Sequence, residues 1–304
     1  LRRAESHTDD EVILFNSCSF REHAEHKVLS RLGHLKKLKR HRPEVVIGVI
    51  GCMAERQKEG LFVSVPHLDL LCGPGELHRL PGLLQEVWER HERVTALAGS
   101  LSRRTHVLKR ALEYDSVEQL DMARQFPVGS GAFQEYVRVQ RGCDKFCTYC
   151  IVPFVRGAER SRPPENILAE VRSLARQGCR EVTLLGQTVN SYVYEENGHV
   201  CRLAHLLERV HAIEGIDRIR FVTSFPADWD ADIFRVMRDY PRVCPYLHIP
   251  AQSGSDHMLK AMKRGYTAAE YLRLMDTARH DVPDSALAGD FMVGYSQFSS
   301  AQHP

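Results

Sequence analysis

Short apolar runs alternate with amphipathic segments along most of the chain, in two successive series. The first series contains strand-like runs at residues 12–15, 45–50 and 68–71, and helix-like segments at about 21–40 and 77–91. Strands that alternate with helices form a parallel sheet covered on both faces. Groups that follow the strands then gather at one sheet edge, where such folds bind ligands. We therefore expect an open parallel-sheet domain in the N-terminal part of the chain.

The second series repeats this pattern with more units. We expect strands at residues 136–140, 182–185, 218–222, 246–249 and 287–293, and helices at 166–177, 203–213, 230–239 and 268–280. Repeated strand–helix units build a barrel or partial barrel, with functional side chains at the carboxyl ends of the strands. The expected fold class is α/β, with an open parallel-sheet domain followed by a partial (β/α)6 barrel.

The periodic pattern weakens between about residues 100 and 131, where Gly129-Ser130-Gly131 is typical of a linker. We expect domains at residues 1–110 and 133–304, joined by a linker at 111–132, and 304 residues leave room for both. Because the sequence starts at Leu1 rather than Met and stops at Pro304, we expect it to be a piece of a longer protein.

The composition excludes several classes of protein. Hydrophobic residues make up 43% and charged residues 26%, which is ordinary for a globular domain and excludes general disorder. No apolar run is long enough to span a membrane, and no signal peptide is visible. A net charge of +2 excludes a basic footprint over the whole chain. Residues 21–42 nevertheless carry eight Lys and Arg against two Glu, which fits either a solvated helix face or a phosphate-facing patch.

Three of the nine cysteines lie close together in the sequence. An odd number of cysteines without a secretion signal argues against a disulfide framework and for reduced thiols. Cys143, Cys147 and Cys150 form a C-x3-C-x2-C pattern directly after the first strand of the second series. Three thiolates in one short loop can hold three corners of a cuboidal iron–sulfur cluster, which leaves one iron open. The alternative is a zinc site, although structural zinc usually takes four ligands in pairs and no second pair is near.

The cysteine spacing, with Tyr149 before the last cysteine, resembles the radical S-adenosylmethionine (SAM) superfamily. The surrounding sequence, up to about Gly294, is similar to the tRNA methylthiotransferases of the MiaB type within it. The similar segments are residues 16–22, 51–56, 141–157, 159–163, 184–192, 247–256 and 262–266. The resemblance implies that Cys143, Cys147 and Cys150 bind a 4Fe–4S cluster whose open iron binds SAM, and that Tyr149 packs near the SAM adenine. The second domain is then a radical-SAM barrel.

The same resemblance implies a second, auxiliary 4Fe–4S cluster held by three N-terminal cysteines. Two of these match Cys18 and Cys52, and the first belongs to a Gly-Cys-Gln-Met-Asn segment expected upstream of residue 1. The alternative for Cys18 and Cys52 is a small buried side chain at a strand end, a common place for cysteine. We interpret Cys72 as incidental, and Cys179, Cys201 and Cys244 as packing residues.

Further site residues are expected from the same resemblance. Five polar residues at strand ends are expected to line the pocket for SAM or the base: Gln187, Asn190, Ser224, Gln252 and Asp290. Their alternative role is hydrogen bonding within loops. Arg156, Arg160 and Arg162 are expected to meet tRNA phosphate or the SAM carboxylate, since arginine matches either anion bidentately. Surface ion pairs are the alternative for each of them, and no single catalytic residue is assigned.

The implied reaction transfers a methylthio group to C2 of N6-isopentenyladenosine next to the anticodon of tRNA. An aromatic C–H bond has no useful acidity, so radical chemistry is needed. The alternatives are a sister enzyme that acts on N6-threonylcarbamoyladenosine or on a ribosomal-protein aspartate, and a non-catalytic RNA-binding module with structural zinc. The sequences at residues 20–22 and 186–190 favour the isopentenyladenosine branch.

The expected partners are the tRNA anticodon stem-loop and an electron donor, with no membrane contact and a monomeric state. The expected location is the cytoplasm, and an organelle is the alternative. After Gly294 the family continues Phe-Pro-Gly-Glu-Thr, whereas this chain continues Tyr295-Ser296-Gln297. The sixth barrel strand and the family's RNA-binding TRAM domain are therefore expected to lie outside this sequence.

Overall fold

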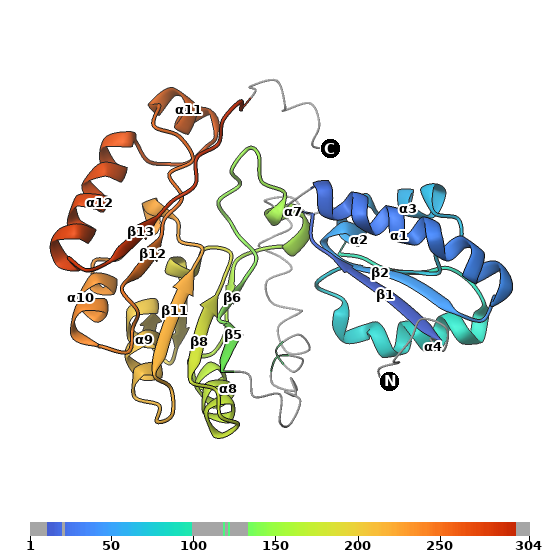
Figure 1. Cartoon of the computed structure of the whole chain (residues 1–304), viewed down its shortest axis with the longest axis horizontal. Helices are drawn as coiled ribbons and strands as arrows, with labels where there is room; N and C mark the ends of the chain where they lie inside the picture. The colour runs from blue at the N-terminus through green and yellow to red at the C-terminus, as the bar shows by residue number, and fades with distance from the viewer. Residues whose placement is uncertain (1–10, 20–21, 99–117, 119–120, 122–132, 296–304) are drawn as a thin grey trace. The chain divides into compact units, whose positions relative to one another are not determined.

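The computed structural model describes residues 11–19, 22–98, 118, 121 and 133–295 (Figure 1). The chain divides into two compact units. The first comprises Leu1–Leu120 with Ile151–Gly157, and the second comprises Asp121–Cys150 with Ala158–Pro304. Most of the linker expected at 111–132 lies outside the described residues, as do Phe20 and Arg21.

The first unit contains a four-stranded parallel sheet in the order β1-β2-β3-β4. Its strands are β1 (Val12–Ser17), β2 (Val46–Gly51), β3 (Leu70–Cys72) and β4 (Val94–Ala96). Its helices are α1 (Glu22–His41), α2 (Cys52–Gln57), α3 (Gly60–Ser64), the short 3-10 helix η1 (Leu77–Arg79) and α4 (Leu80–Arg90). The sheet is the one expected from the first series, and β4 extends it by one strand.

Alternation along β2 explains why helices cover both faces of this sheet. Ile47 packs on one face with Leu32 of α1 and Met53 of α2. Val46 packs on the other face with Leu84 of α4. Neighbouring side chains of a strand point to opposite faces, so a strand that is apolar throughout must be covered twice.

The second unit contains five parallel strands that follow one another in sequence order. A three-stranded sheet comprises β5 (Gln134–Arg138), β8 (Glu181–Leu185) and β11 (Arg218–Val222), with β8 in the centre. A second ladder pairs β12 (Tyr246–His248) with β13 (Ala286–Ala288). A parallel bridge between Ile219 and Val243 links the two ladders. The expected α/β class with a partial barrel is thereby confirmed.

Helices connect these strands (Figure 1). They are α8 (Pro164–Arg176), α9 (Leu203–His211), α10 (Asp232–Asp239), α11 (Asp256–Ala261) and α12 (Ala268–Asp281). All of them except α11 share a core with the strands, and Leu259 of α11 packs instead with Cys147. Thr267 caps α12 by accepting a hydrogen bond from the Glu270 N–H, while the Glu270 carboxylate accepts one from the Thr267 N–H. This reciprocal capping box explains why the last long helix starts where it does.

Several small elements differ from the expectations. The strand expected at 287–293 is only three residues long, because Gly289 and Asp290 leave the ladder before a single bridge from Gln252 to Phe291. The hairpin of β9 (Val193–Glu196) and β10 (His199–Arg202) was not expected. Its turn residues Asn197 and Gly198 both have positive φ, and an Asn-Gly pair favours this turn. Within the described ranges, no helix is both long and apolar enough to cross a membrane.

Candidate functional site

The cysteine loop lies at the carboxyl end of the first strand of the second unit. The short strand β6 (Gln140–Arg141) pairs with β7 (Arg160–Ser161) on either side of the loop and so closes its base. Gly142 and Phe146 both have positive φ, which gives the loop its tight course. At its far side the Thr148 N–H donates to the Met262 carbonyl at 3.2 Å, and the Thr148 hydroxyl to the Ala261 carbonyl at 3.1 Å. The loop is therefore held at its base by strand pairing and at its far side by the two hydrogen bonds of Thr148.

The three thiols of this loop lie in a mostly apolar setting. Cys143 and Cys147 are each 7% exposed, and Cys150 is partly exposed. Burial raises the pKa of Cys143 to about 12, and the charges of Cys150 and Cys147 add to the rise. Cys147 packs in a small cluster with Phe225, Leu259 and Tyr266. Such thiols ionise when a metal centre compensates the charge of the thiolate.

The donor set fits an iron–sulfur cluster by its chemistry. Each of the three thiolates would bind a different iron of a cuboidal cluster, so the sulfurs need not converge on one point. In the part of the chain that the structure describes, no three His, Cys, Asp or Glu side chains are placed so that they could all bind one metal ion. Cys143, Cys147 and Cys150 are the residues that would hold such a cluster.

A buried arginine lies against the cysteine loop. Arg264 is 5% exposed, and its Nη1 donates to the Cys147 sulfur at 3.4 Å and to the Tyr149 hydroxyl at 3.2 Å. Burial is the main reason that the pKa of Tyr149 is raised, although the charge of Arg264 opposes the rise. Arg264 was not among the expected site residues. Its segment, 262–266, was one of the similar segments, and that was the only sequence signal for it.

A lysine of the cysteine loop contacts the segment that follows β11. Lys145 forms an ion pair with Asp228 and lies 5.4 Å from the ring centre of Phe225. Burial lowers the pKa of Lys145, but the hydrogen bond to Asp228 and the negative charges of Glu159 and Asp228 together outweigh burial and raise the pKa overall. Lys145 and Asp228 line a cavity of about 280 Å³. Its lining residues are Lys145, Asn190, Ser191, Tyr192, Val193, Arg202, Leu203, Asp228 and Asp230.

Glu159 connects the cysteine loop to the loop after β8. Its carboxylate accepts hydrogen bonds from the Thr188 hydroxyl at 2.9 Å and the Ser191 hydroxyl at 2.8 Å. Its backbone N–H donates to the Asp144 carboxylate at 3.1 Å. Burial raises the pKa of Glu159 despite these contacts. The polar network therefore fixes the loops after β6 and β8 relative to each other.

The strand-end residues expected to line a pocket have different environments. Asn190 is 5% exposed, and its amide exchanges two hydrogen bonds with the Phe225 backbone, at 2.8 and 2.7 Å. This reciprocal contact gives Asn190 a positioning role. Ser224 is also buried, and its hydroxyl has no hydrogen-bond partner among the described residues. Gln187 follows β8 and is partly exposed.

Gln252 and Asp290 meet where β12 and β13 end. The Gln252 N–H donates to the Asp290 carbonyl at 2.8 Å, and Gln252 has a φ of 65°. His248 Nε2 lies 3.0 Å from the exposed Asp290 carboxylate. Both expected residues therefore belong to one strand-end group, which His248 joins.

The three expected arginines divide into accessible and buried side chains. Arg156 is exposed at the end of α7 (Val152–Arg156), and Arg160 is partly exposed in β7. Arg162 is 2% exposed and forms an ion pair with Glu170. A buried guanidinium cannot reach a polynucleotide, so the expectation of an RNA contact does not hold for Arg162.

In the first unit, Cys18 and Cys52 follow two adjacent parallel strands. Ser17 of β1 pairs with Gly51 of β2, so the two cysteines are the next residues of both strands at the same sheet edge. Gly51 has a φ of 88°, and a Cβ there would lie 2.6 Å from Asn16 Oδ1. Only glycine lets β2 run directly into α2 at Cys52. Two thiols at one sheet edge fit two ligands of a shared metal centre.

Cys72 differs from these two residues. It is the last residue of β3 and is wholly buried, and its thiol donates to the Gly73 carbonyl at 3.6 Å. Burial raises the pKa of Cys72 to about 12. This setting suits a packing residue.

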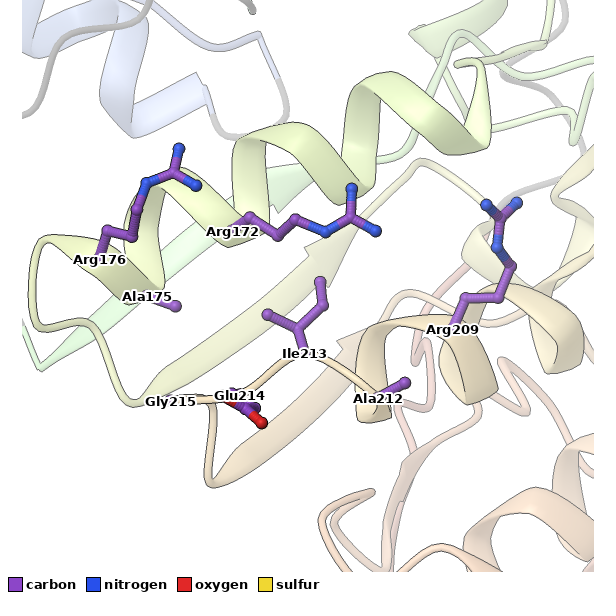
Figure 2. A pocket seen from close by; sticks show the side chains of 8 residues that line it. All are labelled: Arg172, Ala175, Arg176, Arg209, Ala212, Ile213, Glu214 and Gly215. Carbon is purple, nitrogen blue, oxygen red and sulfur yellow. The ribbon is translucent and has the colours of Figure 1, made fainter.

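A second hollow in this unit is a groove of about 520 Å³ (Figure 2). It is lined by residues of α8, α9 and the segment before β11, which are Arg172, Ala175, Arg176, Arg209, Ala212, Ile213, Glu214 and Gly215. Helix-to-strand connections lie at the amino ends of parallel strands, opposite the end that carries the cysteines. The groove is therefore separate from the candidate site.

Two family models match the sequence. One, described as the radical SAM superfamily, matches residues 137–298. The other, described as uncharacterized protein family UPF0004, matches residues 1–73. The first model covers the cysteine loop and all five parallel strands except the start of β5.

Curated relatives are similar along most of this chain. A tRNA-2-methylthio-N(6)-dimethylallyladenosine synthase of Rhodopirellula baltica is 46% identical over 285 residues, which cover 94% of this chain and 59% of the relative. A protein of the same name from Idiomarina loihiensis is 40% identical over 299 residues, with 98% and 59% covered. One from Neisseria meningitidis is 40% identical, with 94% and 61% covered. The chain thus spans about three fifths of the length of these relatives.

Solved structures share the fold. The radical S-adenosylmethionine methyltransferase TsrM from Kitasatospora setae aligns with a TM-score of 0.63 at 15% identity, and covers 92% of this chain and 56% of its own. The cobalamin-dependent S-adenosylmethionine radical enzyme OxsB aligns with a TM-score of 0.61 at 14% identity, with 92% and 40% covered. At this identity the likeness concerns the fold alone.

Proposed function

The chain belongs to the radical SAM superfamily, and from that membership we propose that it transfers a methylthio group to C2 of N6-isopentenyladenosine in tRNA. The observation that carries the proposal is the C-x3-C-x2-C loop at the carboxyl ends of the barrel strands. The choice of reaction rests on the similarity to synthases of 2-methylthio-N6-dimethylallyladenosine along 94% of the chain.

Cys143, Cys147 and Cys150 are proposed to hold a 4Fe–4S cluster. When bound, that cluster supplies an open iron for SAM and the low-potential electron for its reductive cleavage. The chain's own contribution is to shield this place from water, because Phe225, Leu259 and Tyr266 surround Cys147. Excluding water protects a reactive radical from side reactions.

Polar groups at the strand ends are proposed to bind SAM and the base. Buried Ser224, whose hydroxyl has no partner in the part of the chain that the structure describes, is proposed as one of these groups, and Asn190 holds the backbone beside it in place. Gln187, Gln252 and Asp290 follow other strands and are proposed to complete the pocket, with Tyr149 near the adenine. Glu159 supports this arrangement by fixing the Thr188 and Ser191 side chains.

Cys18 and Cys52 are proposed to contribute two ligands of an auxiliary 4Fe–4S cluster. Their support is the register of β1 and β2, which carries both residues at one sheet edge. Arg156 and Arg160 are proposed to contact tRNA phosphates near the anticodon. An external electron donor, a monomeric state and a cytoplasmic location complete the proposal.

Anaerobic reconstitution tests the enzyme class. Protein reconstituted with iron and sulfide and reduced with dithionite is expected to convert SAM to 5′-deoxyadenosine, measured by chromatography with mass detection. Bound zinc without iron, together with no SAM cleavage, would point to the non-catalytic RNA-binding alternative and overturn the proposal.

Nucleoside analysis tests the substrate. In tRNA from a strain that lacks the gene, the 2-methylthio-N6-isopentenyladenosine nucleoside is expected to disappear and the unmodified isopentenyl nucleoside to accumulate. Retention of the methylthio-isopentenyl nucleoside, with loss of the methylthio form of threonylcarbamoyladenosine, would favour the sister enzyme instead.

A further inference from the structure

Arg264 is a buried cation whose hydrogen-bond partners are all uncharged groups or a cysteine. Its Nε donates to the Tyr266 hydroxyl at 3.0 Å, and its Nη2 donates to the Pro250 carbonyl at 3.2 Å. Its guanidinium carbon lies 4.4 Å from the ring centre of Phe225. Among the residues that the structure describes, no carboxylate forms an ion pair with it.

This arrangement is energetically unusual. A buried charge is costly unless an opposite charge compensates it, and aromatic faces and neutral oxygens compensate only in part. Arg162, another buried arginine of the same unit, has Glu170 as its carboxylate partner. Arg264 has instead the Cys147 sulfur at 3.4 Å. An anionic thiolate at that position would supply the missing counter-charge.

We propose that Arg264 is the counter-charge of the iron–sulfur centre held by Cys147 and raises its reduction potential. This inference rests on the proposed function, because it requires a cluster on the cysteine loop. A fixed positive charge, with a hydrogen bond to a ligand sulfur, stabilises the form that carries one more electron. Arg264 Nη1, which donates to the Cys147 sulfur, also donates to the Tyr149 hydroxyl, so the positive charge is held beside the cysteine loop.

Substitution of Arg264 tests this role through the cluster's potential, independently of turnover. Intact reconstituted protein is titrated with dithionite while the reduced cluster is followed by electron paramagnetic resonance. Arg264→Met and Arg264→Gln are expected to lower the equilibrium constant for one-electron reduction about tenfold, which equals a shift of about 59 mV to lower potential. Arg264→Lys keeps the charge and is expected to have a reduction potential close to that of the wild type.

Arg242→Met is the matched control. The Arg242 guanidinium also donates to backbone carbonyls, those of His211 at 2.9 Å and Ile213 at 3.1 Å, but it does not contact the cysteine loop. Its substitution is expected to leave the potential unchanged. An unchanged potential in Arg264→Met that retains wild-type iron and sulfide overturns the inference and leaves the proposed function intact.

Loss of the cluster in the neutral variants is also informative. Iron retained in Arg264→Lys and lost in Arg264→Met supports a requirement for the charge. Equal loss of iron in both variants overturns the inference, because the guanidinium would then act through packing alone. Wild-type protein that takes up neither iron nor sulfide overturns the inference and the proposed function together.

Discussion

Arg162 and Glu170 form a buried ion pair, with Nη1 2.8 Å from Oε2 and side chains that are 3% and 6% exposed. Arg162 also donates to the Arg138 carbonyl at 2.5 Å. The pair therefore joins the end of β5 to α8, directly beside the base of the cysteine loop. Its role is to order the scaffold that supports the loop.

Breaking this pair should be strongly destabilising. We expect Glu170→Leu to lower the free energy of unfolding by about 3–5 kcal/mol, because the buried guanidinium loses its 2.8 Å carboxylate partner and Asp121, at 3.7 Å, compensates less. The double variant Arg162→Met with Glu170→Leu should lose much less, since both charges of the pair are removed together. Urea unfolding measures both. The exposed pair of Arg180 and Asp217 is the control, and Asp217→Asn should cost about 1 kcal/mol or less. Equal losses in the single and double variants would contradict this account.

Each cysteine of the loop should be needed for SAM cleavage. Replacing Cys143, Cys147 or Cys150 by Ala is expected to abolish 5′-deoxyadenosine formation and to lower bound iron and sulfide, because three thiolates hold the cluster. Cys201→Ala is the control and should keep both properties. Full SAM cleavage in Cys150→Ala would remove that residue from the ligand set.

The cysteines of the first unit should affect iron that is bound separately from the cysteine loop. Cys18→Ala and Cys52→Ala are expected to lower the iron content of the reconstituted protein, yet to leave SAM cleavage in place. Cys72→Ala should change neither, because its thiol is wholly buried in β3. Iron and sulfide analysis beside the cleavage assay provides the comparison. If Cys72→Ala reduced iron as far as Cys52→Ala does, Cys72 would belong to the site.

Asn190 is expected to contribute mainly to the stability of the fold. Asn190→Ala removes both hydrogen bonds to the Phe225 backbone and leaves the buried Phe225 N–H unpaired, while the Phe225 carbonyl keeps its bond from the Asp228 N–H at 3.2 Å. We expect the unsatisfied N–H to lower the free energy of unfolding, measured in urea, by about 1–3 kcal/mol. Gln187→Ala, at a partly exposed position, should cost far less. Comparable losses would show that the amide of Asn190 is not a structural clamp.

The first unit should lose stability in acid through Glu25. Burial raises the pKa of Glu25, but hydrogen bonds from Arg56 and Gln57, together with the charge of Arg56, outweigh burial and hold the pKa below its ordinary value of 4.5. Its stabilising contribution is therefore complete above about pH 4.5 and is lost as the pH falls through the lower folded-state pKa.

Glu25→Gln tests this dependence. The difference in unfolding free energy between wild type and Glu25→Gln should be largest near neutral pH and should shrink below about pH 4.5. Urea titrations at several pH values measure it, with the exposed Glu89→Gln as control. A difference that does not vary with pH would argue against the ion pair with Arg56.

Local sequence was sufficient for the α/β class, most strand positions and the resemblance to the radical SAM superfamily. Apolar periodicity reports burial within one strand or helix, and C-x3-C-x2-C lies within eight residues, so neither depends on distant contacts. The extent of β13 and the additional β4 were beyond this reach, because both depend on pairing with a neighbouring strand. The Asn197-Gly198 pair is a local sequence signal for the hairpin of β9 and β10.

Contacts between distant segments decided the roles of individual side chains. Arg162 and Arg156 are the same residue type in one short stretch, yet only the fold buries the first and exposes the second. Arg264 meets Cys147 across 117 residues of chain, and Ser17 meets Gly51 through strand register. The free energy of such contacts arises from burial and pairing that exist only after the chain has closed on itself. No local pattern can therefore report whether a given charge or amide is already satisfied.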